Sequence, residues 1–294
     1  MVAIMAVCPG SEDSSGQGDD RQFARLVCKQ GEDGTMRIKV LGCHGADMAL
    51  PGASGAAHCC GFLVNDTVLI DAGTIASALC LKEQLKIRHI CLTHLHFDHI
   101  KALPIFADNV SLDMEAPVRL TSTPSVLDGL RQHIFNDAVY PNFFALPRPD
   151  EAVFVGHTLR LGEPFEACGL EITAVPVNHS VPAVGFLIRE GDASFLYSGD
   201  TCSTDELWKV AARERTLKAA FIETSFPDEL FDLALTSKHL TPALLKQEVS
   251  KFGRPDVPIY IYHMKPSHAA AIESQVRGLG HGITILREGQ EVIL

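Results

Sequence analysis

Alternating apolar and polar positions predict short β-strands along most of the chain. The segment 36–42, MRIKVLG, alternates in this way, and 61–73, GFLVNDTVLIDAG, holds two apolar runs separated by Asn65 and Asp66. Asn and Asp favour turns, so 61–73 is predicted to form two strands joined by a tight turn. Further strands are predicted at 88–94, 170–179, 183–190, 194–200, 219–225 and 257–263.

Three segments show helical spacing instead. The segment 74–86 carries good helix formers at that spacing. The segment 241–253 has Thr241 as a predicted N-cap, Pro242 at the first position and Gly253 just past the end. The segment 267–280 opens with Ser267. This mixture of strands and helices predicts an α/β (α+β) fold.

The N-terminal end differs from the rest of the chain. Residues 11–20, SEDSSGQGDD, are polar and acidic, so 1–35 is predicted to be a flexible or peripheral segment. No linker-like stretch follows, and 36–294 is predicted to form one domain. The apolar opening lacks a basic start and is cut short by Pro9 and Gly10, so we expect no signal peptide. No apolar run is long enough to cross a bilayer.

The net charge limits the kinds of binding partner that we expect, and the cysteine content indicates the cellular compartment. The formal net charge is −11, which disfavours long nucleic acid because such binding relies on basic patches. A small anionic substrate is still compatible, since metal ions can supply the local positive charge. The nine cysteines are odd in number and no pair is spaced Cys-x-x-Cys, which argues against a disulfide framework. We therefore expect a reducing, cytoplasmic location with no membrane partner.

Four candidate metal ligands, three histidines and one aspartate, occur within the hexapeptide HLHFDH, which runs from His94 to His99. In an extended chain residues two apart point the same way, so His94 and His96 can bind one metal together. Asp98 and His99 follow as the chain turns, and can face a second metal. A helix would align His94 with Asp98 and leave His96 on another face, so we favour the extended path. Such a concentration of His and Asp predicts metal binding.

Further candidate ligands follow other predicted strands. His179, Asp200 and His263 each follow an apolar strand, and Gly199 before Asp200 allows close approach of the backbone. Taken singly, each would more often be a structural residue. Together with the hexapeptide they complete a site of five histidines and two aspartates, with Asp200 as the bridging ligand. Imidazole and carboxylate ligands suit zinc, with manganese or iron as alternatives.

These motifs resemble a known family. The heptapeptide THLHFDH resembles the Thr-His-x-His-x-Asp-His signature of the metallo-β-lactamase-fold hydrolases. The segments PVNHSVPAVGF, LYSGDT, FIETSFPDEL, SKHLTP and IYIYHMKP resemble, in this order, the class II cyclic-nucleotide phosphodiesterase branch of that family. The resemblance covers about residue 36 to the C-terminus. It implies a four-layer αββα sandwich, in which two mixed sheets pack face to face with helices outside.

The resemblance also implies a role for each site residue. One metal would be held by His94, His96 and His179, the other by Asp98, His99 and His263, and Asp200 would bridge both. His239 matches a proton donor to the leaving oxygen, Glu223 matches the acid that orients it, and Asp98 is counted among the catalytic residues too.

Other residues near these motifs carry weaker expectations. Lys238 and Lys265 flank proposed site histidines and are predicted to contact a phosphate. Phe97 stands where this branch often has Leu, Lys238 where Gly is frequent, and His44 where small residues are usual. None of these departures removes a ligand, but they leave substrate preference open. The remaining histidines, including His44 and His58, are interpreted as structural.

The resulting hypothesis is an enzyme with two divalent metal ions that hydrolyses a 3′,5′-cyclic nucleotide to a 5′-nucleotide, with a bridging hydroxide as nucleophile. The runner-up is another phosphodiesterase, such as a tRNA 3′-processing nuclease, although the acidic balance counts against it. A thioester hydrolase of the same fold is a third alternative. A degenerate, non-catalytic nucleotide-binding scaffold is a fourth, and the complete ligand set argues against it. A homodimer is left open.

Overall fold

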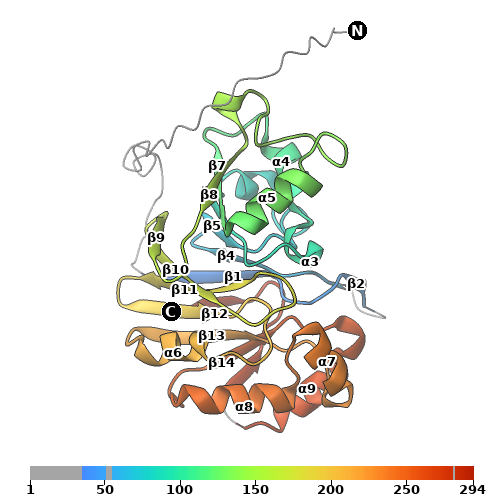
Figure 1. The fold of residues 1–294 in the computed structure, drawn as a ribbon, viewed down its shortest axis with the longest axis vertical. Coiled ribbons are helices and arrows are strands. Elements are labelled where there is room, and N and C mark those ends of the chain that lie inside the picture. Colours follow the sequence, from blue (N-terminus) through green and yellow to red (C-terminus); the bar gives the residue numbers. More distant parts are fainter. Residues whose placement is uncertain (1–34, 51–54, 281) are drawn as a thin grey trace.

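The computed structural model describes residues 35–50, 55–280 and 282–294. Two seven-stranded sheets face each other, with α4 and α5 outside one sheet and α6 and α8 outside the other (Figure 1). The predicted four-layer αββα sandwich is therefore confirmed. The predicted N-terminal segment 1–35 lies outside the described residues except for its last residue. None of the helices in the described ranges has the length and apolarity that a membrane span needs.

Each sheet is half antiparallel and half parallel. The first has the order β16-β1-β4-β5-β6-β7-β8 and is parallel from β5 to β8; the second has the order β15-β14-β13-β12-β11-β10-β9 and is parallel from β12 to β15. The strands of the first sheet are β1 (Arg37–Gly42), β4 (Gly61–Val64), β5 (Val68–Ile70), β6 (His89–Cys91), β7 (Val118–Ser122), β8 (Phe154–Thr158) and β16 (Glu291–Ile293). Those of the second are β9 (Pro164–Ala167), β10 (Leu170–Pro176), β11 (Val184–Glu190), β12 (Ala193–Tyr197), β13 (Leu217–Glu223), β14 (Ile259–Tyr262) and β15 (Ile283–Ile285).

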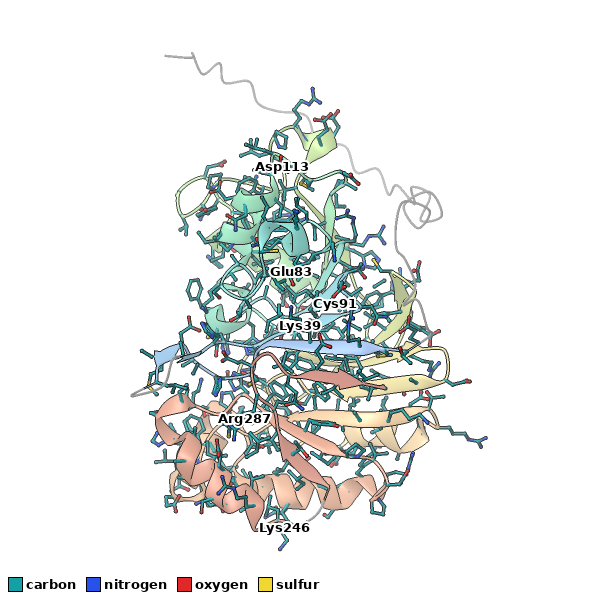
Figure 2. The ribbon with its side chains drawn as sticks, turned by 180° about the vertical axis from the view of Figure 1, so that it is seen from behind. Lys39, Glu83, Cys91, Asp113, Lys246 and Arg287 are labelled. Carbon is teal, nitrogen blue, oxygen red and sulfur yellow. The ribbon has the colours of Figure 1, made fainter. Side chains whose placement is uncertain are left out.

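The helices fill the outer layers and the loops between strands. They are α2 (Leu81–Gln84), α3 (Phe97–Ile100), α4 (Leu103–Val110), α5 (Pro124–His133), α6 (Glu206–Arg213), α7 (Phe231–Ser237), α8 (Pro242–Phe252) and α9 (Ala269–Arg277). Short 3₁₀ turns occupy Pro149–Glu151, Asp228–Leu230 and Pro266–His268, and a small ribbon pairs β2 (Met48–Ala49) with β3 (Ala56–Ala57). Figure 2 shows Asp113 and Lys246 at the outer helical layers, far from the buried Cys91 between them.

Three apolar clusters occupy the three interfaces between the four layers. The cluster between the sheets contains aromatic rings, with Phe62 edge-on to Tyr197 at 5.2 Å and to Tyr262 at 5.4 Å between ring centroids. Such pairs stabilise a core by about 0.5–1.5 kcal/mol each beyond the burial of their area. The loops after β6, β10, β12, β13 and β14 carry the candidate site residues.

Several predicted elements are confirmed with small shifts. The turn between β4 and β5 falls at Asn65 and Asp66, which both have positive φ. Helix α8 begins after Thr241, whose side chain accepts from the Leu244 amide, and ends before Gly253 at φ 66°. The predicted helix 267–280 becomes a 3₁₀ turn followed by α9. The predicted strand 88–94 pairs as a strand only to Cys91.

The predicted helix over 74–86 is wrong for most of its length, because only Leu81–Gln84 is helical. Its apolar spacing is real, since Ile75 and Leu79 are buried against the outer face of the first sheet. However, the Ala78 and Leu79 amides both donate to the Ile75 carbonyl, which makes a single turn. Helix α2 begins separately, after Cys80, whose backbone amide donates to the Glu83 side chain.

Candidate metal centre

The hexapeptide that begins at His94 leaves β6 in an extended path and then turns. His96 is extended, at φ −63° and ψ 144°, and serves as the N-cap of α3. Asp98 and His99 lie in the first turn of α3. The structure agrees with the prediction at His96, which is extended, and at Asp98 and His99, which follow as the chain turns into α3.

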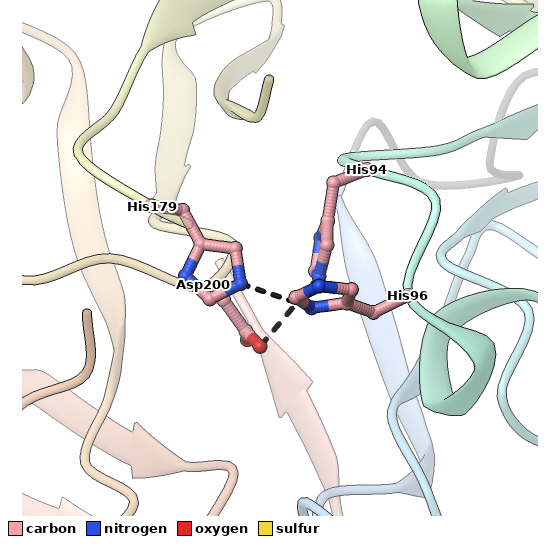
Figure 3. Close-up of side chains that lie close together, drawn as sticks. All are labelled: His94, His96, His179 and Asp200. Carbon is pink, nitrogen blue, oxygen red and sulfur yellow. Dashed lines mark hydrogen bonds and ion pairs between the residues drawn. The ribbon is translucent and has the colours of Figure 1, made fainter. Parts of the chain in front are cut away.

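A first group of possible ligands consists of His94, His96, His179 and Asp200, whose side chains point toward one another (Figure 3). His96 Nδ1 lies 3.0 Å from His179 Nε2, and His94 Nε2 lies 3.7 Å from Asp200 Oδ2. One donor atom from each of the four residues lies within 4.8 Å of the others. Gly199 has φ +59°, and a Cβ there would meet the Val184 carbonyl at 2.7 Å, so glycine is required before Asp200.

A second group contains Asp98, His99 and His263, again next to Asp200. His99 Nε2 lies 3.3 Å from Asp200 Oδ1, and His263 Nε2 lies 3.3 Å from Asp200 Oδ2. His263 Nε2 is also 3.4 Å from Asp98 Oδ2 and 3.3 Å from His99 Nε2. Asp200 therefore contacts both groups, as a bridging ligand must.

These distances fit two bound metal ions. Ligands about 2.0–2.1 Å from a tetrahedral ion lie about 3.3 Å from one another, and the observed separations of 3.0–3.7 Å surround that value. Two atoms of the site, His94 Nε2 and Asp200 Oδ1, are buried and have no hydrogen-bond partner. Orphaned buried polar atoms are rare, and a cation would satisfy both.

Hydrogen bonds behind the ligands fix which ring nitrogen faces the centre. Thr93 Oγ1 donates to Asp71 and so can accept from His94 Nδ1, 2.9 Å away. His99 Nδ1 lies 2.8 Å from Asp71 Oδ2, which also accepts from the Tyr197 hydroxyl. In both rings Nε2 is therefore the nitrogen that faces the centre, where a metal ion would take the place of a proton.

Hydrogen bonds to Nδ1 also orient the other two candidate ligands that face the centre with Nε2, His179 and His263. His179 Nδ1 lies 3.1 Å from the carbonyl oxygen of Lys238, which has the left-handed φ of 62°. His263 Nδ1 lies 2.8 Å from Ser225 Oγ, and that hydroxyl in turn donates to Glu223. These supporting groups were missed by sequence reasoning. Only Asp71 had a signal, because this acidic residue directly follows the apolar run VLI of a predicted strand.

Burial and charge set the protonation of the ligands. Burial lowers the pKa of His94, His96 and His179, which keeps these rings neutral and able to bind a cation. Burial would lower the pKa of His99 too, but the charges of Asp200 and Asp71 raise it well above its ordinary value. The carboxylates thus favour positive charge at this point, whether a proton or a metal ion supplies it.

His239 and Glu223 form a pair at the edge of the centre. His239 Nδ1 lies 2.8 Å from Glu223 Oε1 and 4.0 Å from Asp200 Oδ2. Glu223 is fully buried and also accepts from the Thr201 amide and Ser225 hydroxyl. Burial opposes protonation of His239, but the charge and hydrogen bond of Glu223 raise its pKa overall. Because Nδ1 faces Glu223, the other nitrogen, Nε2, is the atom available to a ligand.

The two predicted substrate-binding lysines differ in position. Lys265 Nζ donates to the Gly45 carbonyl at 2.6 Å and lies 3.7 Å from Asp98 Oδ2, so its ammonium borders the second group of ligands. Lys238 Nζ donates to the exposed Asn178 side chain at 3.3 Å. Its backbone carbonyl, not its ammonium, is the part that contacts a proposed ligand.

Residues 66–278 match the family described as Beta-lactamase superfamily domain. Over 209 residues the chain is 27% identical to a probable 3′,5′-cyclic-nucleotide phosphodiesterase of Yersinia pestis, which covers 60% of this chain and 56% of that protein. Over 158 residues it is 28% identical to ribonuclease Z of Mycobacterium sp. (strain KMS), which covers 49% of this chain and 52% of that protein. The chain thus spans little more than half the length of these relatives. Unliganded yeast PDE1 shares the fold, with a TM-score of 0.74 and 18% identity over 88% of this chain and 99% of that one.

Proposed function

The chain belongs to the β-lactamase superfamily, and from that membership we propose that it hydrolyses a phosphodiester, with a 3′,5′-cyclic nucleotide as substrate and a 5′-nucleotide as product. The observation that carries the proposal is the His239–Glu223 pair, 2.8 Å apart and next to seven side chains that could hold metal ions. The relative from Yersinia pestis, a probable 3′,5′-cyclic-nucleotide phosphodiesterase, supports the choice of substrate.

Each group has a task in this proposal. His94, His96 and His179 would hold one divalent ion and Asp98, His99 and His263 another, with Asp200 shared between them. Zinc suits these ligands, and two such ions supply Lewis-acid charge to the phosphate and lower the pKa of water.

The chain's own side chains orient the substrate and move the proton. Lys265, whose Nζ lies 3.7 Å from Asp98 Oδ2, would bind a non-bridging phosphate oxygen. Glu223 holds the Nδ1 proton of His239, so that His239 Nε2 donates its proton to the leaving 3′-oxygen.

One alternative has its own support, namely cleavage of an RNA phosphodiester, because ribonuclease Z is among the relatives. The net charge of −11 counts against a long polyanionic substrate. A non-catalytic scaffold is disfavoured because every ligand position is filled and the supporting hydrogen bonds to His94, His99, His179 and His263 are all present.

The experiment compares His239→Ala with wild type on two substrates. Removal of a general acid should slow hydrolysis of a cyclic nucleotide by about 10²–10⁴-fold, because a ribose oxygen is a poor leaving group that needs the proton. Hydrolysis of bis(p-nitrophenyl) phosphate should change little, since nitrophenolate leaves without a proton. His133→Ala, which removes an exposed histidine at the end of α5, is the matched control. Equal losses on both substrates, at unchanged metal content, would remove His239 from the mechanism.

A further inference from the structure

A second set of metal-ligand side chains lies outside the centre, where the loop after β1 meets the turn between β15 and β16. Cys43, His44 and Glu288 each offer one donor atom, and the three atoms lie within 4.8 Å of one another. His44 Nδ1 is 3.0 Å from Glu288 Oε1 and 3.9 Å from Cys43 Sγ. The proposed function uses none of these three residues.

The geometry and the surroundings of this set fit a tetrahedral ion. A thiolate about 2.3 Å and an imidazole about 2.0–2.1 Å from zinc lie about 3.6 Å apart, and two nitrogen or oxygen ligands about 3.3 Å apart. The observed 3.9 Å and 3.0 Å need only small shifts to match. The Cys43 side chain is buried, whereas those of His44 and Glu288 are 12% and 22% exposed. One side of the set is thus open to solvent, so that an ion can enter.

A fourth side chain, that of His58, orients the carboxylate. The His58 amide and its Nδ1 lie 2.6 Å and 2.7 Å from Glu288 Oε1 and Oε2. Metal-binding carboxylates are commonly held in this way by a neighbouring donor. His44 and His58 are also joined through their backbones, because the His44 amide donates to the His58 carbonyl.

We propose that Cys43, His44 and Glu288 bind a third divalent metal ion of the zinc class, with His58 holding Glu288 in place. The ion would be structural, because it would tie the ends of the β1–β4 loop to the C-terminal turn. It would also brace the main centre, since the Cys43 carbonyl accepts the His263 amide at 2.7 Å. His44 and His58, interpreted from sequence as structural, then become a ligand and the support of a ligand.

In the structure the buried Cys43 thiol donates to the Leu286 carbonyl, 3.5 Å away. Without an ion the thiol therefore stays protonated at neutral pH, and the His44–Glu288 contact is an ordinary hydrogen bond or ion pair. With a zinc-class ion the thiol loses its proton and becomes a thiolate ligand. This difference can be measured directly.

The test replaces the metal with Co²⁺ in the full-length protein and records the absorption spectrum. The main centre offers only nitrogen and oxygen ligands, so a thiolate-to-cobalt charge-transfer band can arise only where a cysteine binds. Wild type should show this band and Cys43→Ser should lose it. The matched control, Cys202→Ser, removes a buried thiol two residues from Asp200 and should keep it.

A metal count gives an independent readout. Glu288→Gln, which keeps the shape of the side chain, should bind one ion fewer per chain than wild type under the same loading conditions. Incomplete metal loading of the main centre lowers the metal content of wild type and Glu288→Gln equally. The difference in metal content between them therefore tests the third site separately from the proposed function. A wild-type spectrum without a charge-transfer band would overturn the proposal, even if a variant fails to fold. So would a band that survives Cys43→Ser, or equal metal content in wild type and Glu288→Gln.

Discussion

Replacement of Asp71 by Asn should weaken one metal site selectively, although Asp71 is not a proposed ligand. Asp71 is fully buried and accepts from four groups. Oδ1 accepts from the Thr93 amide and hydroxyl, and Oδ2 from Thr93 Oγ1, the Tyr197 hydroxyl and His99 Nδ1. An Asn side chain has the same shape but turns one of these acceptors into a donor.

The orientation of the new amide decides the outcome. The NH₂ group cannot face the Thr93 amide, which is a donor in every state, so it must take the position of Oδ2. Hydroxyls of Thr93 and Tyr197 can rotate to accept, but His99 can accept only by moving its proton from Nδ1 to Nε2. That tautomer places a proton on the atom that would bind the metal.

The expected loss is therefore about 10–100-fold in the affinity for the ion that His99 would bind, the usual cost of removing such a support. Affinity for the ion bound by His96 and His179 should change much less. Competition with a chelator, followed by the stepwise release of metal, measures the two affinities. Tyr197→Phe is the matched control, because it removes one hydrogen bond to Asp71, worth about 1 kcal/mol, without altering the His99 tautomer. If Asp71→Asn released both metal ions with the same affinities as wild type, the reasoning would be refuted.

Three further predictions concern other parts of the molecule. Asp200→Ala should abolish activity more completely than His263→Ala, because Asp200 contacts both groups of ligands; equal residual rates at matched metal content would argue against a bridge. Lys265→Ala should raise the Michaelis constant without changing metal content, and Lys238→Ala should act in the same direction more weakly, since its ammonium binds Asn178; unchanged constants in both would remove the lysines from substrate binding. Hydrogen bonds from the Cys80 amide and from Lys39 lower the pKa of Glu83 from 4.5 to about 2. The ionised Glu83 carboxylate therefore stabilises the fold above pH 4.5, and this contribution is lost as the pH falls toward 2. Glu83→Gln should flatten this part of the acid-unfolding curve, and an unchanged curve would contradict the assignment.

Local signals in the sequence predicted the elements whose ends are set by local contacts. Thr241 and Gly253 mark the ends of α8, and Asn65 and Asp66 mark a turn, because capping and turn geometry involve only nearby residues. The helix predicted over 74–86 was wrong because the buried Ile75 and Leu79 fit a helical period, although the backbone makes only a turn there. Tertiary packing can use the same apolar spacing without a helix.

At the candidate site too, local features were predictable from the sequence and long-range contacts were not. The ligand types and their places at strand ends were readable, and the structure brings all seven together. The groups behind the ligands were not, because Asp71 and His99 are 28 residues apart and Ser225 and His263 are 38 apart. Such contacts depend on which strands pair within a sheet, because β5 lies beside β6 and β13 beside β14. Similarly, nothing near Lys238 in the sequence indicates that its carbonyl holds His179.

The most direct test of the proposed function is turnover of a 3′,5′-cyclic nucleotide by the zinc-loaded wild-type protein, with Asp200→Ala as the background. We expect a rate far above that background, with the 5′-nucleotide as the product, because His239 is proposed to donate its proton to the 3′-oxygen. Absence of turnover above Asp200→Ala by fully metal-loaded protein would contradict the proposal, and so would release of a 3′-nucleotide.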